Sequence, residues 1–165
     1  MKIPLIGTEI TLSDDTDITG IGLTIFTAGC PHMCKGCHNE QSWDVKNGVL
    51  TELQEIKSKI KKSITLIKYI CFCGGEPLLY KEAVVELSKF SKQYGLKVIL
   101  YTGYRFEEIE DDILLNIDTI IDGRYEIELD TGKFPASENQ NIYVNGNKLS
   151  RQEIDTLQIN KKFGG

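Results

Sequence analysis

Between residues 20 and 121, short apolar segments alternate with segments that have helical character. The apolar segments predict strands at 20–28, 69–73, 96–101 and 117–121. Helices are predicted after Gly48, with Thr51 as an N-cap, and at 83–94 and 106–115. Strands and helices that alternate in this way are typical of βαβ units, whose crossover helices cover a parallel sheet. The sequence therefore predicts an α/β fold.

The length of 165 residues limits how large this fold can be. A chain of this size buries roughly 68–70% of its unfolded surface, so it can form a core without disulfides. A complete eight-fold α/β barrel typically needs about 250 residues, so a full barrel is excluded. We expect one domain over 1–165, with a core at about 20–126 and an irregular C-terminal tail at 127–165. In that tail, Asn145-Gly146 predicts a hairpin turn and the last five residues are expected to fray.

Charge and cysteine content narrow the class of protein. Nineteen Lys and Arg residues against twenty-four Asp and Glu residues give a net charge of −5, which argues against non-specific binding to nucleic acids or anionic membranes. Five cysteines is an odd number, which disfavours a secreted disulfide scaffold. The sequence lacks a long apolar stretch and a signal-peptide pattern. We expect a cytoplasmic protein with reduced thiols.

Each predicted strand is followed by a polar or glycine-rich segment, and ligands of parallel sheets bind at such strand ends. The first segment, GCPHMCKGCHN, holds Cys30, Cys34 and Cys37 with the spacing C-x3-C-x2-C. Three thiolates can hold a 4Fe-4S cluster and leave one iron open to an external ligand. The spacing also permits a Cys3His zinc site with His32 or His38 as the fourth ligand.

The stretch GCPHMCKGCHNEQSWD resembles the cluster loop of the radical S-adenosylmethionine superfamily. Within that superfamily it is most similar to the proteins that activate anaerobic ribonucleoside-triphosphate reductases. The segments CGGEPLL at 73–79, YTGYRFEEI at 101–109 and IDTIIDGRYE at 117–126 resemble further motifs of this group, in the same order. Most of the superfamily has an aromatic residue just before the third cysteine, where this chain has Gly36. The reductase activators also have glycine at this position. The tail departs from the group at 136–140, which reads ASENQ where relatives often have Ser-Ser-Asn-Gln.

The resemblance implies a shortened, open partial barrel of the TIM type and an enzymatic function. It implies a 4Fe-4S cluster on the three loop cysteines and S-adenosylmethionine, which is cleaved to a 5′-deoxyadenosyl radical that takes a hydrogen atom from a glycine of the reductase. The implied partners are the large, glycyl-radical subunit of the reductase and a flavodoxin-type electron donor. The alternatives are a different target, such as pyruvate formate-lyase or a small molecule, and a non-catalytic zinc module.

The resemblance also implies where S-adenosylmethionine binds. The expected contacts are Gly36, Cys37, His38, Gly74, Gly75, Glu76 and Thr102. Glycines allow the backbone to approach a ligand closely, and the Glu76 carboxylate has the right sign for the methionine ammonium group. The ring of His38 is expected either against the adenine or in solvent.

Other residues near the strand ends have two interpretations each. Residues 122–124 either border the adenosyl group or meet the partner, and Arg124 could equally form a surface ion pair. Cys71 and Cys73 are two apart on a strand and point to one face, where they are expected to pack as small apolar residues rather than to hold a second cluster. Trp43 is expected to pack the cysteine loop closed.

Overall fold

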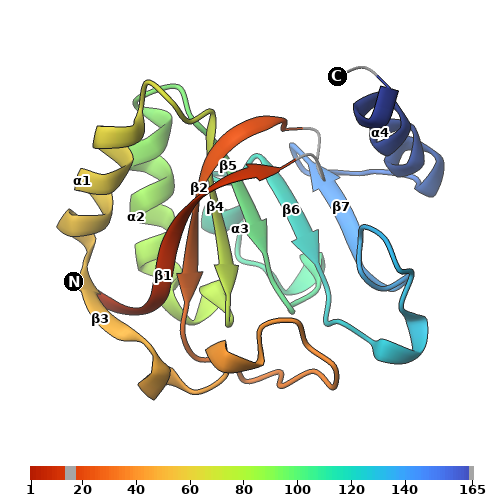
Figure 1. Ribbon diagram of the computed structural model, residues 1–165, viewed down its shortest axis with the longest axis horizontal. Helices are drawn as coiled ribbons and strands as arrows, with labels where there is room; N and C mark the ends of the chain where they lie inside the picture. Colours follow the sequence, from red (N-terminus) through yellow and green to blue (C-terminus); the bar gives the residue numbers. More distant parts are fainter. Residues whose placement is uncertain (14–17, 164–165) are drawn as a thin grey trace.

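The computed structural model describes residues 1–13 and 18–163, and these residues form one sheet of eight strands. The strand order is β3-β1-β2-β4-β5-β6-β7-β8 (Figure 1). The four central strands are parallel: β2 (Gly20–Thr27), β4 (Tyr69–Gly74), β5 (Lys97–Tyr101) and β6 (Thr119–Asp122). They are the four strands that the apolar segments predict, so the α/β class is confirmed.

The outer strands correct the prediction of a purely parallel sheet. On one side, β1 (Lys2–Ser13) pairs antiparallel with both β2 and β3 (Val49–Glu52). On the other side, β7 (Asn141–Val144) pairs antiparallel with β6 and with β8 (Asn147–Lys148). The sequence pattern of β1 is hard to read because a register shift between Leu5 and Gly7 interrupts its alternation.

Three helices, α1 (Leu53–Ser63), α2 (Lys81–Lys92) and α3 (Asp111–Leu114), pack on one face of the sheet. The main core lies between them and the strands, and its most deeply buried members include Ile25, Ile56, Phe72, Leu87 and Leu100. Alternation along β4 sends Ile70 and Phe72 into this core, whereas Tyr69 and Cys71 enter a smaller cluster on the other face. The helix α4 (Arg151–Phe163) adds Ile154 to that smaller cluster, and Figure 1 shows α4 at the far end of the sheet from α1 and α2.

Several predicted boundaries are wrong. The helix after Gly48 begins only at Leu53, because Thr51 pairs with Ile3 in the β1–β3 ladder and Glu52 takes the N-cap position. The predicted helix at 106–115 is broken into a 3-10 turn at Phe106–Glu108 and the short α3. Further 3-10 turns lie at Glu40–Ser42, Val45–Asn47, Pro77–Tyr80 and Ile127–Leu129.

The tail is also more regular than predicted, since it contains β7, β8 and α4. The predicted hairpin turn is confirmed, with φ of 49° at Asn145 and 79° at Gly146. Residues 161–163 continue α4 instead of fraying, and residues 164–165 lie outside the described residues. No helix within the described ranges is long and apolar enough to cross a membrane.

Candidate functional site

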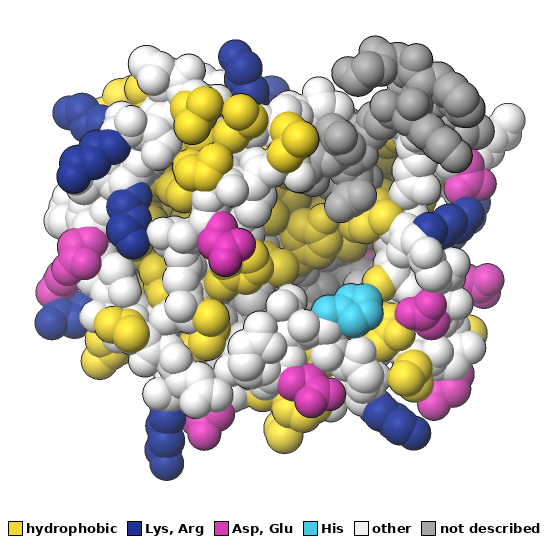
Figure 2. Space-filling view, in the orientation of Figure 1, with side chains coloured by type: hydrophobic (Ala, Val, Ile, Leu, Met, Phe, Trp, Pro, Cys, Tyr) yellow, Lys and Arg dark blue, Asp and Glu magenta, His cyan; other side chains and the backbone are white. Residues whose placement is uncertain are grey.

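A cavity of about 550 Å³ opens at the carboxyl end of the parallel strands. Figure 2 shows a hollow with hydrophobic side chains in the middle of this face, above the loop that follows β2 in Figure 1. Of the predicted site residues, all except Gly36 line the cavity: Cys30, Cys34, Cys37, His38, Gly74, Gly75, Glu76 and Thr102. The strand-end prediction therefore brings these residues together although they are up to 72 positions apart in the chain.

The cysteine loop is closed by its own backbone. The N–H of Gly29 donates to the carbonyl of Ser42 at 2.7 Å, and the N–H of Cys30 donates to the carbonyl of Trp43 at 3.1 Å. The buried Ser42 hydroxyl donates to the carbonyl of Asn39 at 2.6 Å. These hydrogen bonds join the two ends of the cysteine loop, so the loop has a defined conformation.

The loop thiols lie in partly buried positions that backbone N–H groups face. Burial raises the pKa of the Cys30 thiol, and backbone N–H groups of Met33 and His32 oppose that rise. Burial also raises the pKa of the Cys34 thiol, against a backbone hydrogen bond from Tyr125. The Asn39 N–H donates to the Cys37 sulfur at 3.4 Å. Such donors stabilise a sulfur atom that carries negative charge, as a metal-bound thiolate does.

The arrangement of the thiols distinguishes two kinds of metal site. Within residues 1–13 and 18–163, no three His, Cys, Asp or Glu side chains are grouped so that they could hold a metal ion. A 4Fe-4S cluster does not require thiolates to meet at one atom, because each binds a different iron. The His32 ring lies 2.9 Å from the Glu76 carboxylate, and the His38 ring lies 5.3 Å from that of Tyr125. The loop therefore suits a cluster better than a Cys3His zinc site.

Gly74 and Gly75 line the cavity, but the space around them is filled by the protein's own backbone. A Cβ at Gly74, where φ is 101°, would lie 2.5 Å from the Thr27 nitrogen. A Cβ at Gly75 would lie 2.2 Å from the Gly29 carbonyl oxygen. Both positions thus need glycine to let β2 and the cysteine loop approach the end of β4, a requirement that the sequence alone did not reveal.

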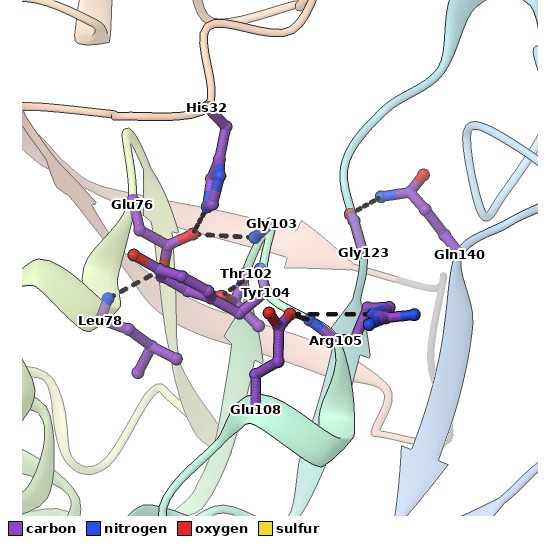
Figure 3. Close-up of polar contacts among 10 residues, drawn as sticks. All are labelled: His32, Glu76, Leu78, Thr102, Gly103, Tyr104, Arg105, Glu108, Gly123 and Gln140. Carbon is purple, nitrogen blue, oxygen red and sulfur yellow. Dashed lines mark hydrogen bonds and ion pairs between the residues drawn. The ribbon is translucent and has the colours of Figure 1, made fainter.

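Glu76 is fully buried, and its carboxylate already has protein partners (Figure 3). It accepts from the Leu78 N–H at 2.9 Å, the Thr102 hydroxyl at 2.9 Å and the Gly103 N–H at 2.8 Å. The Nε2 atom of His32 lies 2.9 Å from the same carboxylate. Glu76 and Thr102 are therefore bonded to each other, and the sequence did not predict the link to His32.

The end of β6 contributes a different set of residues. Asp122 is buried and accepts from the N–H groups of Phe106 and Asn141, both at 2.9 Å, so its carboxylate fixes the strand end and does not line the cavity. Arg124 is exposed and lines the cavity, as does Tyr125.

Tyr125 is a residue that sequence reasoning missed. It contacts the cysteine loop through its backbone at Cys34 and through its ring at His38. Its hydroxyl donates to Asp130 at 2.5 Å, and this bond lowers the pKa of Asp130 and raises that of Tyr125. Gly36, the one predicted site residue outside the cavity lining, faces this segment instead, since a Cβ there would lie 2.8 Å from Ile127.

The segment ASENQ at 136–140 holds the end of β6 in place. The Gln140 side chain donates to the carbonyl of Gly123 at 3.1 Å, and the Asn139 side chain donates to that of Arg124 at 2.7 Å (Figure 3 shows the first bond). The tail thus supports one wall of the cavity.

Several known proteins are similar to this chain in sequence. The profile of a 4Fe-4S single cluster domain matches residues 18–143. The anaerobic ribonucleoside-triphosphate reductase-activating protein of Enterobacteria phage T4 is 36% identical over 135 residues, which cover 76% of this chain and 85% of the relative. That of Vibrio cholerae is 32% identical over 137 residues, with 75% and 88% covered. A pyruvate formate-lyase-activating enzyme of Clostridium pasteurianum is 30% identical over 131 residues, which cover 71% of this chain and 54% of that enzyme. The chain belongs to the family of anaerobic ribonucleoside-triphosphate reductase-activating proteins.

Proposed function

We propose that this protein is an enzyme that installs a glycyl radical on an anaerobic ribonucleoside-triphosphate reductase, and that it does so with a 4Fe-4S cluster and S-adenosylmethionine. The observation that carries the proposal is the position of Cys30, Cys34 and Cys37, which line one cavity at the carboxyl ends of parallel strands. Membership of the activating-protein family supports the same function.

Cys30, Cys34 and Cys37 are proposed as the cluster ligands. When bound, the cluster and S-adenosylmethionine would supply one-electron reduction and hydrogen-atom abstraction. The three cysteines would hold the cluster and leave one of its irons without a protein ligand. Backbone N–H groups at each sulfur, such as that of Asn39 at Cys37, stabilise the thiolate charge.

We place S-adenosylmethionine in the same cavity. The proposed contacts are the main chain at Cys37, Gly74 and Gly75 and the ring of His38, all of which line it. Glu76 and Thr102, which bond to each other, are proposed to shape the wall of this site. Gly36 is proposed to contribute to this binding site through the conformation of the loop, because its φ is 77° and a Cβ at this position would lie 2.8 Å from Ile127.

The sheet is proposed to be the shortened barrel of the radical S-adenosylmethionine fold, within a single domain over 1–165. The strands β2, β4, β5 and β6 follow one another as parallel neighbours, with their helices on one face, as in consecutive βα repeats. A barrel of so few strands stays open at the cavity, which suits a substrate that arrives as a loop of another protein. A flavodoxin-type protein is the proposed electron donor.

A second target is a glycyl-radical enzyme of the pyruvate formate-lyase kind. The Clostridium pasteurianum relative favours it, but this chain matches only 54% of that enzyme, against 85% and 88% of the two reductase activators. The coverage supports the reductase as the primary target.

The test is anaerobic reconstitution with iron and sulfide, followed by incubation with the reductase, S-adenosylmethionine and a reductant. We expect iron on the chain and a glycyl-radical doublet in the electron paramagnetic resonance spectrum of the reductase. A chain that takes up one zinc and no iron would exclude the enzyme. A doublet that forms only on pyruvate formate-lyase would change the target and keep the chemistry.

A further inference from the structure

We infer that His32 is a positioning residue, whose hydrogen bond to Glu76 holds the cysteine loop against the ends of β4 and β5. We call this contact the loop anchor. The inference rests on the proposed function in one respect, namely that Cys30 and Cys34 bind iron. It assigns the Glu76 carboxylate to the protein's own loop and not to the ammonium group of S-adenosylmethionine.

The first observation is the burial of the His32 side chain. Only 3% of it is exposed, although its neighbours Pro31 and Met33 are exposed. The ring packs edge-on against Tyr104, with centroids 4.7 Å apart and planes at 76°. A buried imidazole in an otherwise exposed loop segment fixes that segment to whatever the ring contacts.

The second observation is the set of donors around Glu76. A fully buried carboxylate is stable only when hydrogen bonds replace its water. Three of its donors, Leu78, Thr102 and Gly103, come from the segments that follow β4 and β5. The fourth partner, His32, comes from the cysteine loop, and its Nε2 atom lies 2.9 Å from the carboxylate (Figure 3). Glu76 thus joins three separate segments.

The third observation is the space at Gly103. A Cβ built there would lie 2.3 Å from the Cδ2 atom of His32, and φ is not in the left-handed region. Glycine is therefore needed at this position because the His32 ring occupies the space of a side chain, and not because of the backbone conformation. Gly103 and Glu76 together form a seat that fits the imidazole from two sides.

The position of His32 links the loop anchor to the cluster ligands. His32 is two residues from both Cys30 and Cys34, and the backbone N–H groups of His32 and Met33 face the Cys30 sulfur. Met33 has a φ of 48°, an uncommon conformation for a residue with a side chain. The anchored ring holds this strained turn, so that the N–H groups stay aimed at the sulfur.

The test uses the chain without metal and measures how fast iodoacetamide alkylates Cys30 and Cys34, by peptide mass spectrometry. His32→Phe keeps an aromatic ring but removes the N–H donor. His32→Gln keeps an N–H donor, and Gly103→Ala pushes the ring from its seat without changing a polar group. Lys35→Ala is the matched control in the exposed part of the loop, and every rate is compared with that of the same cysteine in the unsubstituted chain. Circular dichroism checks that each variant folds.

We expect His32→Phe and Gly103→Ala to raise alkylation of Cys30 and Cys34 about tenfold relative to the unsubstituted chain, and His32→Gln to raise it less. The alkylation rate of the double variant His32→Phe/Gly103→Ala should exceed that of the faster single variant by little, because both substitutions remove the same contact. Unchanged rates, or equal rates for His32→Phe and Lys35→Ala, would overturn the inference.

A second measurement separates the loop anchor from a role in S-adenosylmethionine binding. In reconstituted protein, we expect His32→Phe and Glu76→Gln to lose iron to a chelator faster than Lys35→Ala and to shift the cluster's midpoint potential in the same direction. If Glu76→Gln weakens S-adenosylmethionine binding while iron retention stays normal, the carboxylate serves the ligand and the inference is wrong. A wild-type chain without iron would remove the proposed function, yet the alkylation rates would still test the anchor.

Discussion

The cysteines of the loop and those of β4 are the same residue type in two contrasting environments. Cys30, Cys34 and Cys37 lie on a partly buried loop where backbone N–H groups face their sulfur atoms. Cys71 is buried in the apolar cluster on one face of the sheet, whereas Cys73 packs at the edge of that cluster and also lines the cavity. Burial raises the pKa of Cys73 to about 11. Burial raises the pKa of Cys30, Cys34 and Cys73 alike, and Cys73 also has a backbone N–H donor, that of Gly74. The comparison therefore teaches that grouping on one loop separates the ligand candidates from the strand cysteines, because three partly exposed thiols lie there within eight residues.

The largest effect is expected from removing a loop thiol. Cys34→Ala should reduce bound iron to background and abolish the glycyl radical, because one iron loses its anchor. Iron analysis after reconstitution measures this, with Cys71→Ser as the control that keeps its iron. Full iron in Cys34→Ala, or its loss in Cys71→Ser, would reverse the assignment of the two groups.

In the metal-free chain, the free energy of unfolding should depend more on the β4 cysteine than on the loop cysteine. Cys71→Ser places a hydroxyl among Tyr69, Ile99 and Ile121 and should lower the free energy of unfolding by about 1–3 kcal/mol. Cys34→Ser should change it by less than about 0.5 kcal/mol, because the loop position is partly exposed. Urea denaturation compares the two variants. Equal losses in the free energy of unfolding would show that the loop thiols also contribute to the packing of the core.

A smaller effect tests whether the loop is packed as closely as the strand. Gly36→Ala should cost about 1–2 kcal/mol, since φ is 77° and the new Cβ would meet Ile127 at 2.8 Å. Gly132→Ala is the matched control, with φ of 63° and no atom within 4 Å. The same urea experiment applies, and an identical cost at both positions would mean that the Ile127 contact is negligible.

The smallest effect concerns pH. The folded chain keeps the Cys73 proton up to about pH 11, whereas an unfolded thiol releases it near its usual, lower pKa. Its contribution to stability is complete below the unfolded pKa and is lost as pH rises through the folded one. Iodoacetamide labelling of Cys73 should rise roughly tenfold for each pH unit between 8 and 10. Labelling that levels off by pH 9 would mean that Cys73 behaves as an ordinary exposed thiol.

The central strands could be predicted because burial on both faces gives them continuous apolar runs, as in the segment around Phe72. The strand β1 could not, because Ile3 and Leu5 are buried while Ile10 and Leu12 are exposed. The helix start near Thr51 was misplaced because pairing with Ile3 overrides the capping preference.

The composition of the site followed from the sequence, since each strand end carries its own glycine-rich or cysteine-rich signature. Its internal bonds did not follow. The contact between His32 and Glu76 joins residues 44 positions apart, and nothing local in either segment encodes it. The same is true of Gly75, whose neighbour is the Gly29 carbonyl of a different segment.

Trp43 gives the molecule a built-in optical signal. It is the only tryptophan in the chain, and its carbonyl accepts the N–H of Cys30. Its indole nitrogen is buried without a hydrogen-bond partner among the described residues. The emission of the whole protein under tryptophan excitation therefore comes from the point where the cysteine loop closes, so that opening of this loop can be followed by fluorescence without any attached dye.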